Sequence, residues 1–385
     1  MPDQATPQAA APGALHAAGT ARRPAAPPRH LAVYISGGIG DTLMHLGFVK
    51  ALADHAGEPI TLVLATPPVA TPLLLTQPYV RDVLAIPDLH HDKAHRVPRL
   101  TALLAPLGID TLFLFSYQDH VLKAACAAKI PVRAGFLRTH KLWRAPWMTQ
   151  WIWVRRAGTP HPDTHTWLPR LFTKYGYPTR PIEPSLTVTR SAGTDAAADA
   201  AAHAAADAAA HAAADTAADA AADAAAALAQ DHPRLIGFGL STSGVHKRYG
   251  VAQWLDVASQ LADHDPTLSF LLFGAADVAD TAQAILAASP HHLRWLDVTG
   301  SALPLTTGHA LVARCLAFAG NDSMGIHLAV AADVPTVGLF GVTPPMAYSR
   351  LLTPLQASPA GAGMAGIRAS DVARELIRQL GDQAP

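Results

Sequence analysis

Short runs of apolar residues alternate with longer amphipathic segments along most of this chain of 385 residues. Runs of four to six apolar residues predict buried strands, and the segments between them predict helices. The first series of expected strands is 31–36, 60–65, 83–86, 111–115, 133–135 and 185–189, with helices near 42–55, 72–75, 93–107, 120–128 and 165–175. This strand–helix alternation predicts an α/β fold with a doubly wound parallel sheet.

The same rhythm restarts after an Ala-rich block. The second series of expected strands is 235–240, 268–273, 296–300, 315–319 and 336–340, with helices at 251–263, 281–288, 307–313 and 370–380 and one after residue 323. Two Rossmann-like domains are therefore predicted, and their sheet edges can face each other across a cleft. The predicted division is a disordered Ala/Pro-rich tail at 1–30, an N-terminal domain at 31–190, a repeat linker at 191–230 and a C-terminal domain at 231–385.

The block between the two series is a low-complexity repeat. Asp or His recurs every four residues from Asp195 to Asp223, separated almost only by Ala. Because Ala is the best helix former, a helix over about 194–230 is predicted, roughly 50 Å long. It has no broad face of large apolar side chains, so we interpret it as an interdomain linker. The i,i+4 spacing of metal ligands occurs at His203, Asp207, His211 and Asp215, but exposed side chains of this kind are usually solvated, so no metal is expected.

Composition and charge exclude several classes. Lys+Arg and Asp+Glu number 29 each, so the zero net charge offers no electrostatic footprint for nucleic acid, and no nucleic-acid partner is expected. Cys126 and Cys315 lie far apart, which suits a reducing, cytoplasmic compartment. No apolar run approaches the ~20 residues of a membrane span. The pair Arg22-Arg23 is followed by Pro and Ala, so no export signal is expected.

The first candidate site is a GGxGD turn between a strand and a helix. Gly37, Gly38 and Gly40 let the backbone approach a bound group closely, and Asp41 follows at the carboxyl edge of the strand. Asp41 is either a helix cap or a general base, and the spacing leaves both open. A nicotinamide cofactor is a weak interpretation, because the second strand ends at Thr66 where an acidic ribose ligand is usual.

Two further candidate sites follow strands of the second series. Thr242, Ser243 and Lys247 offer hydroxyls and one ammonium beside a strand–helix turn, which suits a diphosphate or forms a solvated turn. The second cluster is Asn321 to His327, in which Asn321, Asp322 and Ser323 lie at the start of an apolar helix and His327 lies one turn into it. The N-terminus of that helix predicts an anion site, and an ordinary capped helix is the alternative.

A basic aromatic window interrupts the rhythm of the first domain. Four of the seven tryptophans fall between 138 and 156. The residues that define the window are Trp143, Trp147, Trp151 and Trp153 with Arg138, Lys141, Arg144, Arg155 and Arg156. They either tuck aromatics onto the core or form a surface for a sugar or an anionic amphiphile, since Trp suits a half-wet interface.

Taken in order, three segments resemble glycosyltransferase family 9, the ADP-heptose:lipopolysaccharide heptosyltransferase family. They are IGDTLMHLGFVKAL, the turn Val298-Thr299-Gly300, and GNDSMGIHLAVAADVPTVGLFGVTPP. The resemblance runs from about 31 to 380 without the repeat. It implies a GT-B fold with an acceptor-binding N-terminal domain and a donor-binding C-terminal domain. It also implies inverting transfer of a heptose or related sugar from an ADP-sugar to a lipopolysaccharide-core or surface-glycan acceptor, with no metal or other cofactor.

The resemblance also implies roles for single residues. Asp41 would be the general base, and Asp322 would bind the heptose. Donor phosphates would be held by Thr242, Ser243, Lys247, Ser323, Met324 and Gly325, and the donor sugar and ribose by Asp322, Asp277 and His327. We place the acceptor at Arg138, Lys141, Trp143 and Arg144, and this basic aromatic surface leaves peripheral contact with the inner face of the inner membrane open.

The chain departs from the family pattern at three positions. Met324 stands where Gly is common, Gly47 where Pro is usual and Tyr249 where Trp is usual. The alternatives are another nucleotide sugar, a protein acceptor, or a degenerate scaffold that only binds sugar nucleotide.

Overall fold

The computed structural model describes residues 30–65, 68–86, 95–154, 164–179, 183–186 and 203–381, without the side chains of 139–142, 164 and 203–210. The expected tail therefore lies outside the described residues except for His30. The segment 187–202, where the domain break and the start of the repeat were expected, lies outside them as well.

The N-terminal half contains a parallel six-stranded sheet in the order β3-β2-β1-β4-β5-β6. Its strands are β1 (Leu31–Ile35), β2 (Ile60–Leu64), β3 (Val80–Ala85), β4 (Thr111–Leu114), β5 (Val132–Arg138) and β6 (Gln150–Val154). Its helices are α1 (Ile39–Ala56), α2 (Thr71–Leu75), α3 (Arg96–Leu104), α4 (Asp119–Ala127) and α5 (Thr164–Tyr175), with a 3₁₀ segment η4 (Thr139–Trp147). The expected β-α-β alternation is confirmed, and β6 is an edge strand that the Trp-rich pattern did not predict.

The C-terminal half repeats this arrangement in the order β12-β11-β10-β7-β8-β9. Its strands are β7 (Leu235–Gly239), β8 (Ser269–Phe273), β9 (Trp295–Asp297), β10 (Cys315–Asn321), β11 (Thr336–Phe340) and β12 (Leu352–Gln356). Its helices are α7 (Val251–His264), α8 (Ala279–Ala288), α9 (Leu305–Val312), α10 (Met324–Ala331) and α11 (Ala369–Gly381). β12 was not predicted, because Pro354 interrupts the apolar run, and an edge strand tolerates such a proline.

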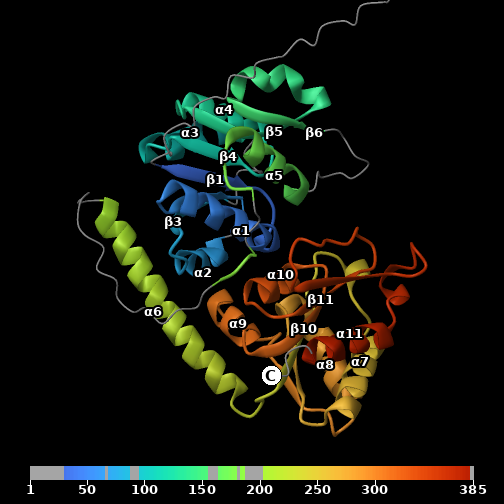
Figure 1. The fold of residues 1–385 in the computed structure, drawn as a ribbon. Helices are drawn as coiled ribbons and strands as arrows, with labels where there is room; N and C mark the ends of the chain where they lie inside the picture. Colours follow the sequence, from blue (N-terminus) through green and yellow to red (C-terminus); the bar gives the residue numbers. More distant parts are fainter. Residues whose placement is uncertain are drawn as a thin grey trace, which may run out of the picture.

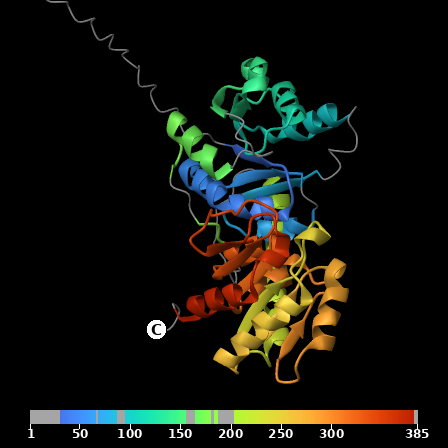
Figure 2. The ribbon, with the colours of Figure 1, turned by 90° about the vertical axis from the view of Figure 1, so that its right-hand side faces the viewer.

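The two halves meet through α1 and α10, which pack against each other. In Figures 1 and 2 the N-terminal half (blue to green) lies above the C-terminal half (yellow to red), with these helices at the junction. A Cβ at Gly40 would lie 2.7 Å from Cδ2 of His327 and 3.4 Å from Cα of Met324. Only a glycine therefore lets the first turn of α1 come this close to the first turn of α10.

A short segment after α5 also bridges the two halves. Tyr79 donates a hydrogen bond of 3.2 Å to the main-chain oxygen of Ser185. On the other side, the Ser185 hydroxyl lies 3.1 Å from Oδ2 of Asp333, and the Leu186 amide donates to the Ala331 carbonyl at 2.6 Å. One buried apolar cluster contains side chains of both sheets, so the halves share a core at this junction.

The repeat helix α6 (His203–Ala229) packs against both halves, through α2 on one side and α9 on the other. Figure 1 shows it running along the side of the molecule. As the sequence indicates, this helix has no broad face of large apolar side chains, and it packs through small side chains instead. The buried positions are Ala214, Ala218, Ala221, Ala225 and Ala229. Small side chains let helices approach closely, so a stripe of alanines is enough to bury this face.

One repeat histidine has a defined place in this packing. The two ring nitrogens of His211 lie 2.8 Å from the Leu75 carbonyl oxygen and 3.0 Å from that of Arg81. The buried alanines also use one three-residue step, whereas the described Asp residues keep a strict four-residue step. For this reason the Asp stripe drifts from half-buried Asp215 to exposed Asp223.

Candidate functional site

Asp41 lies in the first turn of α1, and the glycines before it shape its surroundings. Gly37 has φ +130°, and a Cβ there would lie 2.3 Å from Oδ2 of Asp41. The Gly38 amide donates a hydrogen bond of 2.8 Å to the same oxygen. Asp41 therefore caps its own helix with one carboxylate oxygen, and Oδ1 makes no hydrogen bond to any residue that the structure describes. The interpretations as cap and as base are compatible.

The two loops of the C-terminal half are held together by Asn321. Its side chain is buried, accepts from the Tyr249 amide at 3.0 Å and donates to the Leu240 carbonyl at 2.7 Å. This ties the loop after β7 to the end of β10. Lys247 is consequently brought beside Asp322, although 75 residues separate them in sequence.

An ion pair forms the centre of this side of the site. Nζ of Lys247 lies 3.0 Å from Oδ2 of Asp322, and both side chains are mostly buried, with 19% and 13% exposed. The Thr343 hydroxyl donates to the same oxygen at 2.7 Å. The sequence interpretation assigned no role to Thr343, although the Gly/Thr/Pro turn that contains it was part of the family motif.

The predicted phosphate-binding residues surround this pair. Ser323 is the N-cap of α10 but makes no side-chain cap hydrogen bond, and Met324 and Gly325 begin the helix. The helix starts at Met324, one residue before the glycine, and the Met324 side chain packs against the core. In the loop after β7, Ser243 is exposed, whereas Thr242 is buried and its hydroxyl has no partner among the described residues.

Asp277 occupies a separate polar cluster at the end of β8. Its Oδ1 accepts from the Ser241 hydroxyl at 3.0 Å, and its Oδ2 pairs with Arg248 at 3.1 Å. The carboxylate is 45% exposed. Its predicted role with the ribose stays a prediction.

His327 lies in the contact between α1 and α10, buried to 4% exposure. Its Nδ1 lies 2.7 Å from the Tyr348 hydroxyl. Burial lowers the pKa of His327 to about 4, although the charge of Asp322 raises it in part. The ring is thus neutral at pH 7, and its predicted contact with the donor sugar stays a prediction.

The predicted acceptor residues lie at the carboxyl edge of the N-terminal sheet. Trp143 is 63% exposed, whereas Arg144 is buried. Arg144 forms an ion pair with Asp119, and its guanidinium lies 4.2 Å from the centre of the Trp143 ring. Arg138 ends β5 nearby, and the side chain of Lys141 lies outside the described residues. Among the side chains of this group that the structure describes, Trp143 is the most exposed.

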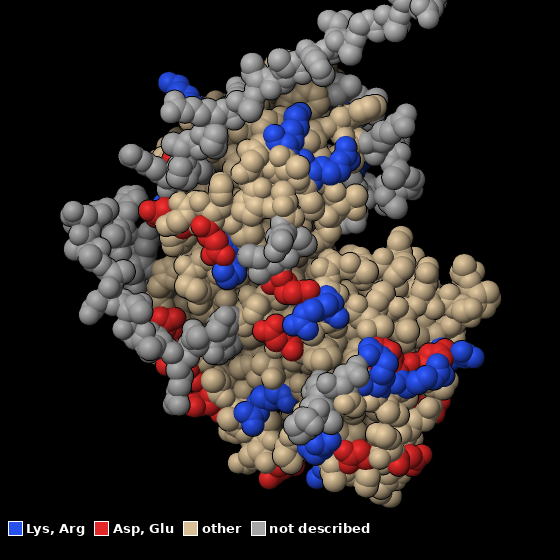
Figure 3. Space-filling view, in the orientation of Figure 1, with Lys and Arg blue, Asp and Glu red and all other residues tan. Residues whose placement is uncertain are grey.

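On the face of the described part of the molecule that Figure 3 shows, acidic and basic side chains lie interspersed. Among the described residues no cluster of three or more His, Cys, Asp or Glu is arranged to hold a metal, and no helix there is long and apolar enough to cross a membrane.

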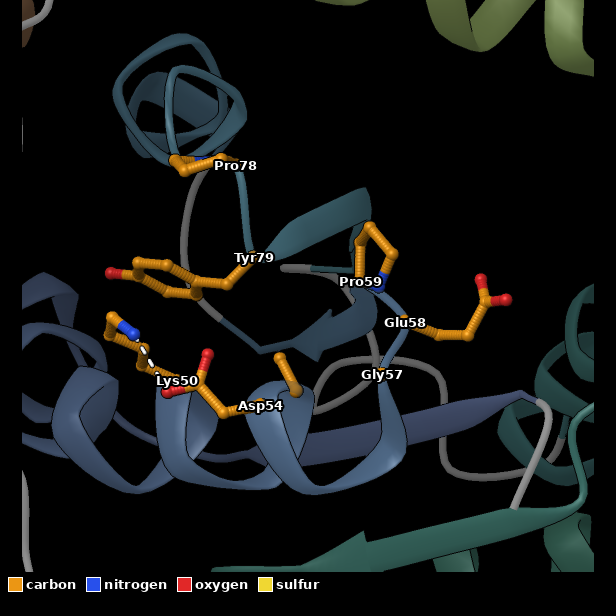
Figure 4. A pocket seen from close by; sticks show the side chains of 8 residues that line it. Lys50, Asp54, Gly57, Glu58, Pro59, Pro78 and Tyr79 are labelled. Carbon is orange, nitrogen blue, oxygen red and sulfur yellow. Dashed lines mark hydrogen bonds and ion pairs between the residues drawn. The ribbon is translucent and has the colours of Figure 1, made fainter. Parts of the chain in front are cut away.

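Figure 4 shows the residues that line a hollow at the opposite edge of the N-terminal sheet, with Tyr79 above Lys50 and Asp54. It contains the ion pair of Lys50 and Asp54, at 2.7 Å. Because it lies at the amino ends of β2 and β3, it is far from the strand ends where open α/β sheets bind ligands.

Two open, doubly wound parallel sheets in one chain are the architecture of the GT-B class. Here their carboxyl edges carry a carboxylate on one side and a lysine–carboxylate pair on the other. The chain matches the model of glycosyltransferase family 9 (heptosyltransferase) over residues 116–360, more than half of its length, and it belongs to that family.

Similar proteins agree with this assignment. Lipopolysaccharide heptosyltransferase 2 of Salmonella typhimurium is 29% identical over 170 residues, which are 41% of this chain and 45% of that protein. The match therefore spans less than half of that relative's length.

Solved structures confirm the fold. The family 9 glycosyltransferase of Veillonella parvula has a TM-score of 0.71 at 15% identity, covering 92% of this chain and 98% of that one. The E. coli ADP-heptose lipopolysaccharide heptosyltransferase II has a TM-score of 0.65 at 18% sequence identity, covering 92% of this chain and 99% of that one. The E. coli heptosyltransferase WaaC with ADP-2-deoxy-2-fluoro heptose has a TM-score of 0.62 at 15% sequence identity, covering 91% of this chain and 99% of that one.

Proposed function

We propose that this protein transfers a heptose from ADP-heptose to a lipopolysaccharide-core or surface-glycan acceptor. The observation that carries the proposal is the meeting of α1 and α10 at their first turns, which places the Asp41 turn beside the donor-side helix in a family 9 fold. The two relatives named for ADP-heptose or its analogue support this donor.

The donor diphosphate is assigned to the C-terminal half. Lys247 offers a cation and the N-terminal amides of α10 offer a helix dipole. The hydroxyl of Thr242, which has no hydrogen-bond partner among the described residues, offers a further donor. These groups would stabilise the charge that develops on the departing nucleoside diphosphate. Asp322 holds the lysine in place and, in this proposal, also accepts from heptose hydroxyls.

The chemistry then requires one base. The acceptor hydroxyl oxygen attacks the anomeric carbon, the bond from that carbon to the diphosphate oxygen breaks, and the electron pair leaves with ADP. The hydroxyl proton passes to the carboxylate of Asp41. Attack opposite the leaving group inverts the anomeric configuration. The proposed reaction needs no cofactor besides the nucleotide sugar.

The acceptor is assigned to the edge of the N-terminal sheet that carries Trp143. An exposed indole beside a guanidinium suits a sugar ring or the head group of an anionic glycolipid. With such an acceptor the protein would work in the cytoplasm at the inner face of the inner membrane.

The test begins with thermal shifts in ADP, UDP, GDP and NAD, followed by turnover with ADP-heptose. At 100 times its Kd a ligand stabilises by about 2.7 kcal/mol, which is readily measured. A shift with ADP and release of ADP from ADP-heptose are expected. A shift with UDP or GDP alone would overturn the donor, and binding without turnover on any glycan would favour a sugar-nucleotide-binding scaffold.

A further inference from the structure

His45 supports the main chain of the proposed base. It lies one turn after Asp41 on α1, is 4% exposed, and its Nδ1 lies 2.5 Å from the Asp41 carbonyl oxygen. Because a carbonyl only accepts hydrogen bonds, Nδ1 carries the proton. Burial and the neighbouring His165 lower the pKa of His45 to about 4, so Nε2 is unprotonated, and it is buried without a hydrogen-bond partner among the described residues.

A stack of rings continues from His45 into the C-terminal half. The His45 ring lies on that of His165 from α5, with centroids 5.4 Å apart and planes 10° apart. His165 in turn stacks on Tyr348 at 5.1 Å. Tyr348 is hydrogen bonded to His327, whose ring touches Gly40 in the first turn of α1. The four rings thus contact α1 at two places, at His45 and at Gly40, which lie on either side of Asp41 in the sequence.

Tyr348 belongs to the loop between β11 and β12, which also contacts the donor side. In this loop Thr343 donates to Asp322, and the Arg350 amide donates to Glu183 of the bridging segment at 3.0 Å. One loop therefore contacts the donor-side carboxylate, the ring stack and the connection between the halves.

We propose that Tyr348 is a positioning residue: through His165 and His45 on one side and His327 on the other, it holds the first turn of α1 so that Asp41 faces the donor. The inference rests on the proposed role of Asp41 as base. A shift of the base by about 1 Å can cost on the order of 100-fold in rate, so a ring contact that sets this position affects turnover without touching substrate.

The test compares Tyr348→Leu and Tyr348→Phe with Tyr177→Leu and Tyr177→Phe. Tyr177 is a matched control, because its hydroxyl donates one hydrogen bond of 3.0 Å to Gln150 and its ring packs on Phe113, toward the far end of α1. In Tyr348→Leu, kcat is expected to fall about 10- to 100-fold with unchanged affinity for ADP. Tyr348→Phe, which keeps the ring, should recover most of that loss. The Tyr177 variants should lose stability alone.

Amide hydrogen exchange of Gly38 and Thr42 gives a second readout that does not depend on activity. Both amides hold the first turn, through Asp41 and the Gly38 carbonyl. Their exchange should quicken in Tyr348→Leu and not in Tyr177→Leu. Unchanged exchange, or unchanged kcat in Tyr348→Leu while Asp41→Asn is inactive, would overturn the positioning role and leave the proposed function standing. If the wild-type protein turns over no nucleotide sugar, the proposed function falls, and the exchange rates still decide whether Tyr348 holds the turn.

Discussion

Asp41 and Asp322 occupy corresponding places in the two halves, and their surroundings differ. Each follows the third strand of its sheet, β1 or β10, and each lies at the start of the helix that packs against the other half. Asp322 is paired with Lys247 and receives the Thr343 hydroxyl. Asp41 has no lysine or arginine in ion-pair contact within the described part of the chain, and its carboxylate receives only the Gly38 amide.

Because of this difference, the same type of side chain can serve two functions, orienting a lysine or accepting a proton. A carboxylate held by an ammonium and a hydroxyl keeps that ammonium oriented. A carboxylate with one free oxygen and no neighbouring cation is open to a proton from an acceptor hydroxyl. The topology of the two sheets gives Asp41 and Asp322 corresponding positions. Their surroundings differ because the loops after β7 and β11 bring Lys247 and Thr343 to Asp322.

The largest effect is expected from Asp41→Asn, which keeps the shape of the side chain and removes its ability to take a proton. We expect kcat to fall roughly 10²–10⁴-fold, with ADP affinity unchanged, because general-base help is of this size. Calorimetry measures the affinity for ADP, and steady-state rates measure kcat. Asp54→Asn, on an exposed carboxylate of the same helix, should leave kcat unchanged. Equal loss of ADP binding would contradict the division between the two carboxylates.

The donor side is tested by Lys247→Ala. Loss of a charge-assisted contact of about 1.5–3 kcal/mol should weaken ADP binding roughly 10- to 100-fold. Lys50→Ala is the control, since Lys50 also pairs with an aspartate but lies in the other half, beside the amino ends of β2 and β3. An unchanged Kd for ADP in a folded Lys247→Ala protein would remove the phosphate role from this lysine.

The comparison also requires that the halves keep facing each other, and α6 is expected to contribute to this. Ala221→Leu forces a larger side chain into the buried stripe and should cost about 1–3 kcal/mol of the free energy of unfolding. Ala220→Leu, one residue earlier and exposed, should change it by less than about 0.5 kcal/mol. Urea denaturation of both variants decides the matter. Equal changes in the free energy of unfolding of the two variants would indicate that α6 is a loosely attached linker.

The smallest effect concerns His309 on α9, which is 1% exposed with neither ring nitrogen hydrogen bonded among the described residues. Burial lowers its pKa to about 4 from 6.5. The unfolded chain therefore binds a proton more readily below pH 6.5, and stability falls as the pH is lowered from 6.5 towards 4. For this one group the loss at pH 5.5 is on the order of 1 kcal/mol.

His309→Leu should remove that loss. Between pH 7.5 and pH 5.5 the free energy of unfolding of the wild-type protein is expected to fall by roughly 1 kcal/mol more than that of the variant, as measured by urea denaturation. Parallel pH dependence of the two proteins would show that His309 is not buried in the neutral form.

Much of the architecture could be predicted from local pattern. Buried parallel strands are continuous apolar runs, and those of β1, β2, β4, β7, β8, β10 and β11 were all recognised. The edge strands β6 and β12 were not, because an edge is half solvated and admits tryptophans and a proline. The limits expected for the domains stay predictions.

The sequence by itself determined the two-sheet fold and the GGxGD turn, and it indicated the residues that we propose bind a diphosphate, since these follow from apolar periodicity and from the ends of strands. Only the tertiary structure decided that Thr343 pairs with Asp322, that four rings surround the turn of Asp41, and that a stripe of alanines docks α6. Each of these contacts joins residues from separate elements. Local pattern is blind to them, because it records which face is apolar and not which surface will cover it.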